Sequence, residues 1–271
     1  MKIGVNRWTM PGSWGLDDCF EAARQAGFDC IEINTAETGD LTPDTSEADA
    51  RRIAQRAKDA GVELSSLSTG LGWAYPLTDP DPDKRRKARD FTAAQIRIAG
   101  WMGLDAILCV PGVVTPDVPY DVAYVRAQDG LRGLEPVAAE NGVVIGVENV
   151  WNKFLLSPIE MARFVDELAS PWVQVYFDVG NVLAFGYPQQ WIRILGKRIK
   201  KAHVKDFRTG IGNIRGFANL LQGDVPWPAV RQAFADIGYD DVVTAEVEGY
   251  PGHPALGLRH IADCLRQAFQ G

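Results

Sequence analysis

The chain has 271 residues, of which 46% are hydrophobic and 23% are charged, a composition typical of a globular protein with a sizeable core. Its formal net charge of -7 argues against a general affinity for nucleic acid or for an anionic membrane, because both favour a basic face. A local basic pocket for an anionic small molecule is still compatible with this charge. No apolar run has the length that crosses a bilayer or the form of a signal peptide, so we expect a cytoplasmic protein with no membrane or nucleic-acid partner.

A short apolar run, followed by a loop and a stretch of helical periodicity, recurs along the chain. The first helical stretch, residues 16–28, ends at Gly27, a favourable C-terminal cap. The second, residues 46–61, opens on a serine with acidic residues in its first turn and closes on a glycine. Residues 83–103, 131–142 and 227–238 repeat the pattern, and each is predicted to be a helix. The apolar runs are predicted to be strands and span residues 2–8, 30–34, 63–68, 106–111, 143–150, 173–179, 199–204 and 242–247.

Eight strand–helix units in this length predict an α/β fold, a (β/α)8 TIM barrel in which residues 1–271 form a single domain. Runs such as VVIGV and VQVYF lack the alternation of a half-exposed strand, as expected for strands that are covered on both faces. A doubly wound open sheet is the alternative, but no glycine-rich dinucleotide fingerprint follows the first strand. The loop at residues 70–83, rich in proline and aspartate, is either a lid or a plain surface loop.

The four cysteines occur singly, without the paired spacing of a disulfide framework or of a thiolate zinc site. We therefore expect reduced thiols at Cys19, Cys30, Cys109 and Cys264.

Ionisable side chains stand where each of the last four predicted strands ends, the positions at which barrels carry their functional groups. The strand ends VIGVENVW, VYFDVGN, KKAHVKD and VTAEVEG supply Glu148, Asp178, His203 and Glu246. Each of them alone could be a cap, an ion-pair partner or a buried hydrogen-bonded group. Together they predict a site for one divalent metal ion, because charges inside apolar runs are costly unless they are paired or bound to metal. Three carboxylates and one imidazole suit Mn²⁺ best, with Mg²⁺, Co²⁺ and Zn²⁺ as alternatives.

Glu248 is the alternative to Glu246 as the last ligand, because the period-two alternation of a strand would aim both side chains the same way. Glu246 lies deeper in the predicted strand and is preferred.

The motifs GVENV, YFDVGN, AHVKD, FANLLQGDVPWPAV and TAEVEG together resemble the xylose-isomerase-like superfamily of sugar and sugar-phosphate isomerases and epimerases. Within it, the chain is most similar to ketose and ketose-phosphate 3-epimerases and hydroxypyruvate isomerases. The resemblance covers nearly the whole chain in strand order. It implies that Glu148, Asp178, His203 and Glu246 bind the metal, and that the two glutamates also form an acid/base pair on opposite faces of a substrate carbon.

The departures from the ketose 3-epimerase pattern concern the substrate more than the metal. Several of those enzymes have a histidine shortly after the aspartate ligand, where this chain has Gly180 and Asn181. Their substrate-binding arginine follows the histidine ligand at a fixed distance, and neither Arg208 nor Arg215 falls at that spacing. The HVKD form resembles the sugar-phosphate branch instead, and Gln222 replaces a glutamate that is common in related chains.

We expect a metal-dependent sugar isomerase that transfers a proton next to a carbonyl through an enediolate, most consistent with a ketose 3-epimerase. Its partner would be a small sugar or sugar phosphate. The predicted substrate-binding residues are Asn149, Asn181, Lys205, Trp14 and Arg208. An ion pair with Asp206 or with another nearby acid is the alternative for Lys205, and ordinary packing is the alternative for Trp14. Further candidates are an apolar wall of Trp8, Trp73, Trp151 and Phe154, and a phosphate site made by residues 209–213 and 248–252 with Arg208, Arg215 and Lys153.

Three other functions stay open on the same barrel. A lyase or dehydratase acting on a keto-sugar or an inosose would use the same metal site but release a fragment. A metal-dependent endonuclease usually needs more histidines, and this chain has His203, His253 and His260. A barrel that binds a ligand without catalysis is the third. A homo-oligomer is compatible with the sequence, although no surface patch identifies one.

Overall fold

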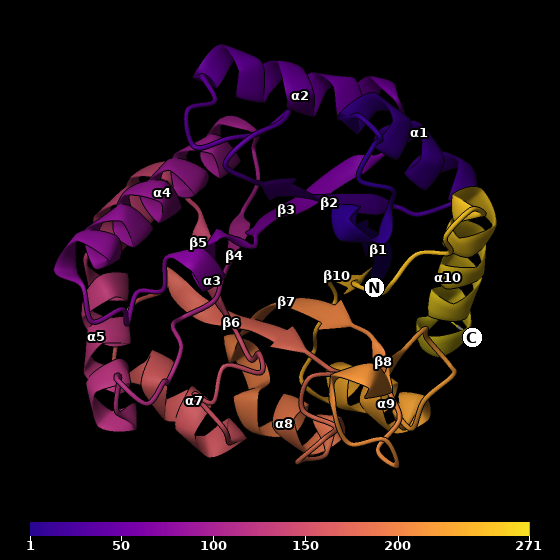
Figure 1. Ribbon diagram of the computed structural model, residues 1–271. Helices are drawn as coiled ribbons and strands as arrows, with labels where there is room; N and C mark the ends of the chain where they lie inside the picture. Colours follow the sequence, from indigo (N-terminus) through magenta and orange to yellow (C-terminus); the bar gives the residue numbers. More distant parts are fainter. Residues whose placement is uncertain (271) are drawn as a thin grey trace.

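Eight parallel strands form a closed barrel in the computed structural model, which describes residues 1–270 (Figure 1). The order around the barrel is β1-β10-β7-β6-β5-β4-β3-β2, and β1 closes the ring against β10 with Lys2 opposite Val242 and Val5 opposite Ala245. The (β/α)8 barrel is thereby confirmed. The barrel strands are β1 (Lys2–Asn6), β2 (Cys30–Thr35), β3 (Glu63–Thr69), β4 (Ala106–Cys109), β5 (Val144–Glu148), β6 (Val173–Asp178), β7 (Ile199–Val204) and β10 (Val242–Ala245).

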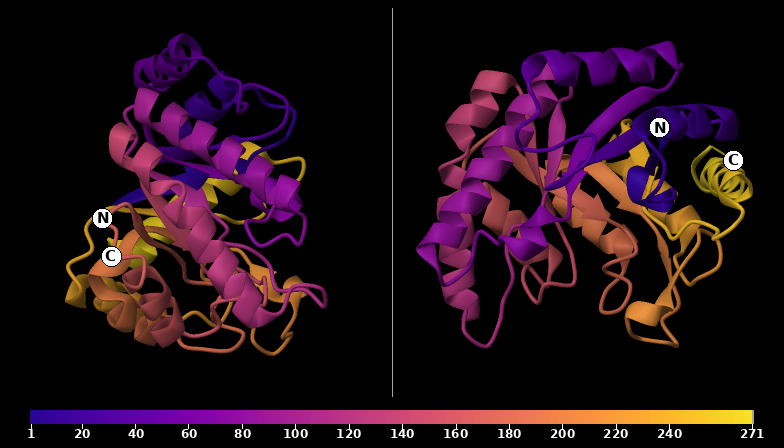
Figure 2. Two further views of the ribbon diagram at one scale, coloured as in Figure 1. Left: turned by 90° about the vertical axis from the view of Figure 1, so that its left-hand side faces the viewer. Right: turned by 45° about the horizontal axis from the view of Figure 1, so that its top comes forward.

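Helices surround the barrel on its outside (Figure 2). The predicted caps form: the Ser46 hydroxyl accepts a hydrogen bond from the Asp49 N–H, and Gly27 adopts the left-handed conformation with φ 86°. The helices are α1 (Leu16–Ala26), α2 (Glu47–Asp59), α3 (Leu71–Ala74), α4 (Pro82–Trp101), α5 (Tyr120–Arg132), α6 (Glu135–Asn141), α7 (Pro158–Asp166), α8 (Pro188–Leu195), α9 (Trp227–Asp236) and α10 (Pro254–Phe269). No helix of residues 1–270 combines the length and apolarity needed to traverse a lipid bilayer.

The helix predicted over residues 131–142 is wrong in its first part, because two helices meet there. Arg132 is the last residue of α5, and α6 starts at Glu135. Pro136 lies in the first turn of α6, where its missing N–H costs nothing, but it cannot continue a helix that arrives from residue 131. The four cysteines are free and buried.

The barrel interior is polar, whereas the surface between strands and helices is apolar. In β2, Ile31 and Ile33 belong to the main apolar core, while the intervening Glu32 is fully buried and contacts His203 of β7. Asn6, Ser66, Ser68 and Tyr176 are also fully buried polar side chains. Burial of this many polar groups requires that they bond to one another.

The strand ends place the predicted ligands at one mouth of the barrel. Glu148 and Asp178 are the last residues of β5 and β6, and Asp178 lies directly opposite His203 of β7. Glu246 follows the last residue of β10, and its N–H still donates to the Val204 carbonyl at 3.1 Å. Beyond β7 the chain forms a small antiparallel hairpin of β8 (Asp206–Phe207) and β9 (Phe217–Ala218), which rises beside this mouth.

Candidate metal centre

The four predicted ligands converge at the carboxyl ends of consecutive barrel strands. Glu148, Asp178, His203 and Glu246 each offer one ligand atom, and these atoms all lie within 4.8 Å of one another. Asp178 and His203 are fully buried, Glu148 is nearly so, and the Glu246 side chain is 22% exposed. One imidazole and three carboxylates with their donor atoms this close can hold a single divalent cation.

The His203 ring has one nitrogen directed at the ligand cluster and the other directed away from it. Its Nδ1 lies 3.3 Å from Glu148 Oε1 and 3.7 Å from Glu246 Oε2. Its Nε2 lies 2.6 Å from Glu32 Oε2 on the opposite side of the ring. A proton on Nε2, donated to Glu32, leaves the Nδ1 lone pair free for a metal ion.

Glu32 is the buried residue that fixes this orientation. Besides His203, its carboxylate accepts hydrogen bonds from the Tyr176 hydroxyl at 2.6 Å, from the Ser66 hydroxyl at 2.7 Å and from the Asn6 amide. Burial by itself would raise the pKa of Glu32, but the His203 ring and these hydrogen bonds outweigh burial and lower the pKa to about 2. Glu32 is therefore an ionised partner of His203 near neutrality.

Sequence reasoning missed Glu32, since it considered only the ends of the later strands. The available signal was a charged residue in the middle of the run CIEINT, which becomes β2. Its partner His203 is 171 residues away along the chain.

The remaining carboxylates of the cluster differ in protonation. Burial raises the pKa of Glu148 to about 7, opposed by its hydrogen bond with His203. Burial also acts on Glu246, but the nearby Lys205 ammonium and the His203 ring lower the pKa of Glu246 below its ordinary value. Near neutrality, Glu246 is ionised while Glu148 is close to its midpoint.

The Lys205 ammonium group lies between two carboxylates of the ligand cluster, those of Asp178 and Glu246. Its Nζ lies 2.8 Å from Asp178 Oδ2 and donates a hydrogen bond to Glu246. Asp178 Oδ2 is nevertheless a buried oxygen without a well-aligned hydrogen bond, so it retains a lone pair for a cation. A side chain at Gly180 would place its Cβ 2.5 Å from Lys205 Cγ and 2.6 Å from the Lys205 carbonyl oxygen. Glycine is therefore required at residue 180, because the Lys205 residue packs directly against its backbone.

The two predicted substrate-binding asparagines, Asn149 and Asn181, form hydrogen bonds that link the ends of β5 and β6. Asn149 accepts a hydrogen bond from the Asp178 N–H and donates one to the Asp178 carbonyl, both at 2.8 Å. Asn181 donates its amide N–H to the Asn149 carbonyl at 2.9 Å, and its backbone N–H donates to Asp178 Oδ1 at 2.7 Å. Both side chains thus position Asp178, and Asn181 also lines the cavity beside the cluster.

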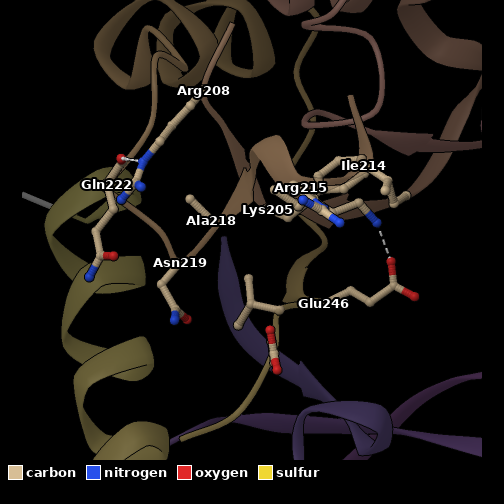
Figure 3. Close-up of a pocket in the computed structure, with 11 residues that line it drawn as sticks. Lys205, Arg208, Ile214, Arg215, Ala218, Asn219, Gln222 and Glu246 are labelled. Carbon is tan, nitrogen blue, oxygen red and sulfur yellow. Dashed lines mark hydrogen bonds and ion pairs between the residues drawn. The ribbon is translucent and has the colours of Figure 1, made fainter. Parts of the chain in front are cut away.

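Two adjoining cavities open at the ligand cluster, and Lys205, Ile214, Phe217 and Glu246 line both. The first, here called the aromatic pocket, has a volume of about 300 Å³ and is walled by Trp8, Trp73, Trp151 and Val110, with Glu148 at its floor. The second, the arginine pocket, has a volume of about 370 Å³ and is lined by Arg208, Arg215, Asn219 and Gln222 (Figure 3). Glu248 also lines it.

Several other predicted groups lie away from the cluster. Trp14 lines a separate surface hollow between α1 and α10, and Phe154 is packed in the core against Tyr120 and Phe164. Neither contributes to the wall of the two pockets. The loop at residues 70–83 contains α3, which brings Trp73 to the aromatic pocket.

Among the described residues, His203 is the one histidine that contributes to the ligand cluster. His260 bonds to the Tyr250 hydroxyl, and His253 precedes α10. This arrangement lacks the extra histidines expected of a multi-metal endonuclease site. Lys153 and the glycine-rich residues 209–213 do not line either pocket, while Glu248 does.

The fold and the cluster together describe a (β/α)8 barrel whose three carboxylates and one histidine, at the carboxyl-end mouth, could hold a divalent metal ion. The family model described as "Xylose isomerase-like TIM barrel" matches residues 20–268. The chain belongs to this family, as its motifs predicted.

Curated relatives are similar over most of the chain. The putative L-ribulose-5-phosphate 3-epimerase SgbU of Escherichia coli strain K12 is 29% identical over 226 residues, which cover 79% of this chain and 76% of that protein. The L-ribulose-5-phosphate 3-epimerase UlaE of the same strain is 25% identical over 223 residues, covering 78% and 75%.

Solved structures share the fold. A D-psicose 3-epimerase determined in the presence of D-fructose superposes with a TM-score of 0.82 at 19% identity, with all of both chains covered. An L-ribulose 3-epimerase superposes with a TM-score of 0.84 at 17% identity, covering 99% of this chain and 94% of that one.

Proposed function

We propose that this protein is a divalent-metal-dependent 3-epimerase of a small ketose. One observation carries the proposal: two glutamates of the ligand cluster approach it from different sides of the barrel mouth and both face the substrate-sized aromatic pocket. Glu148 comes from β5 and Glu246 from the end of β10, with the ligand strands β6 and β7 between them. The curated relatives and several structural neighbours are named as 3-epimerases of ketoses or ketose phosphates, which supports this reaction.

Glu148, Asp178, His203 and Glu246 would hold the metal ion. When bound, such an ion supplies a Lewis acid for the substrate carbonyl and its neighbouring hydroxyl. The donor set favours Mn²⁺ or Mg²⁺, and we propose Mn²⁺ as the working ion. We also propose a cytoplasmic location, consistent with the buried free thiols.

The two glutamates then exchange the proton at the carbon next to the carbonyl. One carboxylate removes the proton from one face, and the carboxyl group of the other returns a proton to the opposite face, so the carbon is inverted without loss of atoms. In the metal-free protein, burial raises the pKa of Glu148 to about 7, whereas Lys205 and His203 lower the pKa of Glu246, so the two glutamates differ in proton affinity before a metal binds. Lys205, between Asp178 and Glu246, is placed to hold an oxygen of the substrate in the cluster.

Isotope exchange tests the proposal. The purified protein, loaded with Mn²⁺ or stripped with a chelator, is incubated in D₂O with L-ribulose, D-fructose and their 3-epimers. We expect metal-dependent formation of the epimer with one deuterium at C3. No exchange with any ketose or ketose phosphate would contradict the proposal, and a product lighter by one water would indicate the dehydratase alternative instead.

A further inference from the structure

The arginine pocket contains two guanidinium groups that have no ion-pair partner. Arg208 and Arg215 are exposed to this pocket, and within residues 1–270 no carboxylate forms an ion pair with either of them. Other arginines of the surface are paired: Arg198 lies 2.7 Å from Asp166, and Arg163 lies 2.6 Å from Glu167. Arg208 is held by a single hydrogen bond from its Nε to the Gln222 carbonyl at 3.0 Å, which leaves its terminal N–H groups free (Figure 3).

The hairpin that carries these arginines is rigidly tied to the barrel. Fully buried Asp206 accepts hydrogen bonds from the backbone N–H groups of Phe207 and Val225 and from the indole N–H of Trp227. The Gly223 backbone passes so close to Asp206 that a Cβ there would lie 2.3 Å from Asp206 Oδ1.

A second carboxylate secures the far side of the hairpin. Asp224 accepts hydrogen bonds from the Thr209 N–H at 2.7 Å and hydroxyl at 2.6 Å, directly after Arg208. The Arg208 backbone N–H also donates to the Gly216 carbonyl at 2.8 Å across the hairpin. Arg215, which precedes Gly216, therefore lies on the facing segment close to Arg208. Arg208 and Arg215 are therefore presented from a fixed frame.

We propose that the arginine pocket binds the terminal phosphate of an open-chain ketose phosphate whose carbonyl end lies at the metal centre. This inference rests on the proposed function and names the substrate class of the same site. The pocket shares Glu246 with the ligand cluster, and it is also lined by Lys205, which pairs with Asp178 and Glu246, so one elongated molecule can contact both. Guanidinium groups suit phosphate because they offer several N–H donors in a planar fork.

The charge in the pocket supports an anionic ligand. Lys205, Arg208 and Arg215 line the pocket together with Glu246 and Glu248, which leaves one net positive charge among the lining residues. Asp224 lies near Arg208 but is not part of the lining. Asn219 lines the same wall, and its Oδ1 is buried without a hydrogen-bond partner, so it can accept a bond from a substrate hydroxyl. The aromatic pocket has no such cation apart from the shared Lys205.

Substrate selectivity tests the phosphate pocket. The Mn²⁺-loaded protein is compared on L-ribulose 5-phosphate, on L-ribulose and on a ketose that ends in a carboxylate. We expect the phosphate to be preferred, and the ratio of kcat/KM for phosphorylated to free ribulose to fall roughly tenfold in each of Arg208→Gln and Arg215→Gln, mainly through KM. Calorimetry with inorganic phosphate should show binding that the double variant loses.

A matched control removes the same charge elsewhere. Arg51 and Arg52 lie on the exposed face of α2 and pair with Glu47 and Asp49, so the double variant Arg51→Gln/Arg52→Gln should keep the selectivity ratio and the phosphate binding. Equal kcat/KM for phosphorylated and free ribulose, a preference for the carboxylate, or an unchanged ratio in both arginine variants would overturn the phosphate pocket while leaving the epimerase proposal intact. Absence of C3 exchange with all three substrates would instead contradict the proposed function. In that case, calorimetry with inorganic phosphate would still show whether the arginine pocket binds phosphate.

Discussion

Two buried glutamates on opposite sides of the barrel interior have opposite electrostatic environments. Glu32, on the side formed by β1 to β3, is surrounded by four hydrogen-bond donors, and its pKa is lowered to about 2. Glu148, on the side formed by β5 to β10, has the His203 ring as its hydrogen-bond partner, and burial raises its pKa to about 7. Both side chains are almost completely removed from water.

The difference separates a supporting side from a reactive side. Donors that saturate a buried carboxylate fix its charge and its position, whereas a buried carboxylate with few donors remains able to bind a cation or a proton. The same His203 ring touches both glutamates, one at each nitrogen. One side of the barrel thus orients the imidazole, and in the proposed mechanism the other side exchanges the proton.

The largest effect is expected from the reactive side. Glu148→Gln and Glu246→Gln each retain a carbonyl oxygen near the metal but cannot accept or deliver a proton, so epimerisation should fall by about 1000-fold. The rate of deuterium incorporation at C3, measured together with the bound metal by elemental analysis, checks this.

Glu63→Gln is the matched control for those two variants. Glu63 begins β3 at the other end of the barrel, where its exposed carboxylate pairs with Lys2 at 2.6 Å. It should have normal activity. If either ligand variant kept more than about a tenth of the wild-type rate with metal bound, that glutamate would not be an acid/base group.

The supporting side should give the next largest effect. Glu32→Gln removes the negative charge behind His203. It also replaces one carboxylate oxygen by an NH2 group, which cannot accept a hydrogen bond from the Tyr176 or Ser66 hydroxyl. We expect Mn²⁺ affinity to fall roughly 10- to 100-fold, as for other carboxylates behind metal-binding histidines. Titration calorimetry measures the affinity, and thermal unfolding of the metal-free protein measures the loss of stability separately.

Tyr176→Phe distinguishes orientation from general stability. It removes one hydrogen bond to Glu32 but leaves the contact between Glu32 and His203, so it should cost about 1 kcal/mol of stability and change metal affinity by less than about threefold. A Glu32→Gln variant that lost stability but kept its metal affinity would show that Glu32 has a structural role alone.

Sequence reasoning grouped the four residues of the ligand cluster and missed Glu32 for a physical reason. Strand ends can be recognised from local periodicity, and in a barrel all carboxyl ends meet at one mouth, so Glu148, Asp178 and Glu246 could be grouped without coordinates. Glu32 lies in mid-strand, and its role depends on which residue stands opposite it across the barrel interior. That pairing is set by barrel closure and register, which local sequence patterns do not contain.

The same limit applies to the asparagines and to Arg208. Asn149 and Asn181 were predicted at the correct strand ends, but their amides bond to backbone groups around Asp178, which only the loop conformation determines. Arg208 reaches the mouth because the β8–β9 hairpin folds back beside it.

A smaller, graded effect should appear in the pH dependence of metal binding. Below about pH 7, Glu148 in the metal-free protein is largely protonated and His203, whose pKa is raised by Glu32 and Glu148 against the effect of burial, is also protonated. Both must lose a proton to bind metal, so affinity should rise by at least about tenfold per pH unit below about pH 7. It should continue to rise above about pH 7, because the raised pKa of His203 delays the loss of its proton. Glu32 is already ionised and should contribute no proton.

Calorimetry in buffers of different ionisation enthalpy counts the protons released. At about pH 6 the wild-type protein should release one more proton than Glu148→Gln. An affinity that does not change between about pH 5.5 and 7.5 would show that the cluster is already deprotonated without metal.

The smallest effect is expected from Trp14, which sequence reasoning placed in the substrate site. Its side chain lines the hollow between α1 and α10 with Asp17, Ala22 and Arg259, whereas Trp73 of α3 lines the aromatic pocket and is 49% exposed. Trp73→Leu removes apolar surface that a substrate would cover and should raise KM by about three- to tenfold, while Trp14→Leu should change KM by less than about twofold. Steady-state kinetics on the preferred ketose, with circular dichroism to verify folding, compares the two variants. Equal increases in KM would place Trp14 in contact with substrate through a movement of the loop before α1, and the aromatic pocket would then extend beyond Trp8 toward α1.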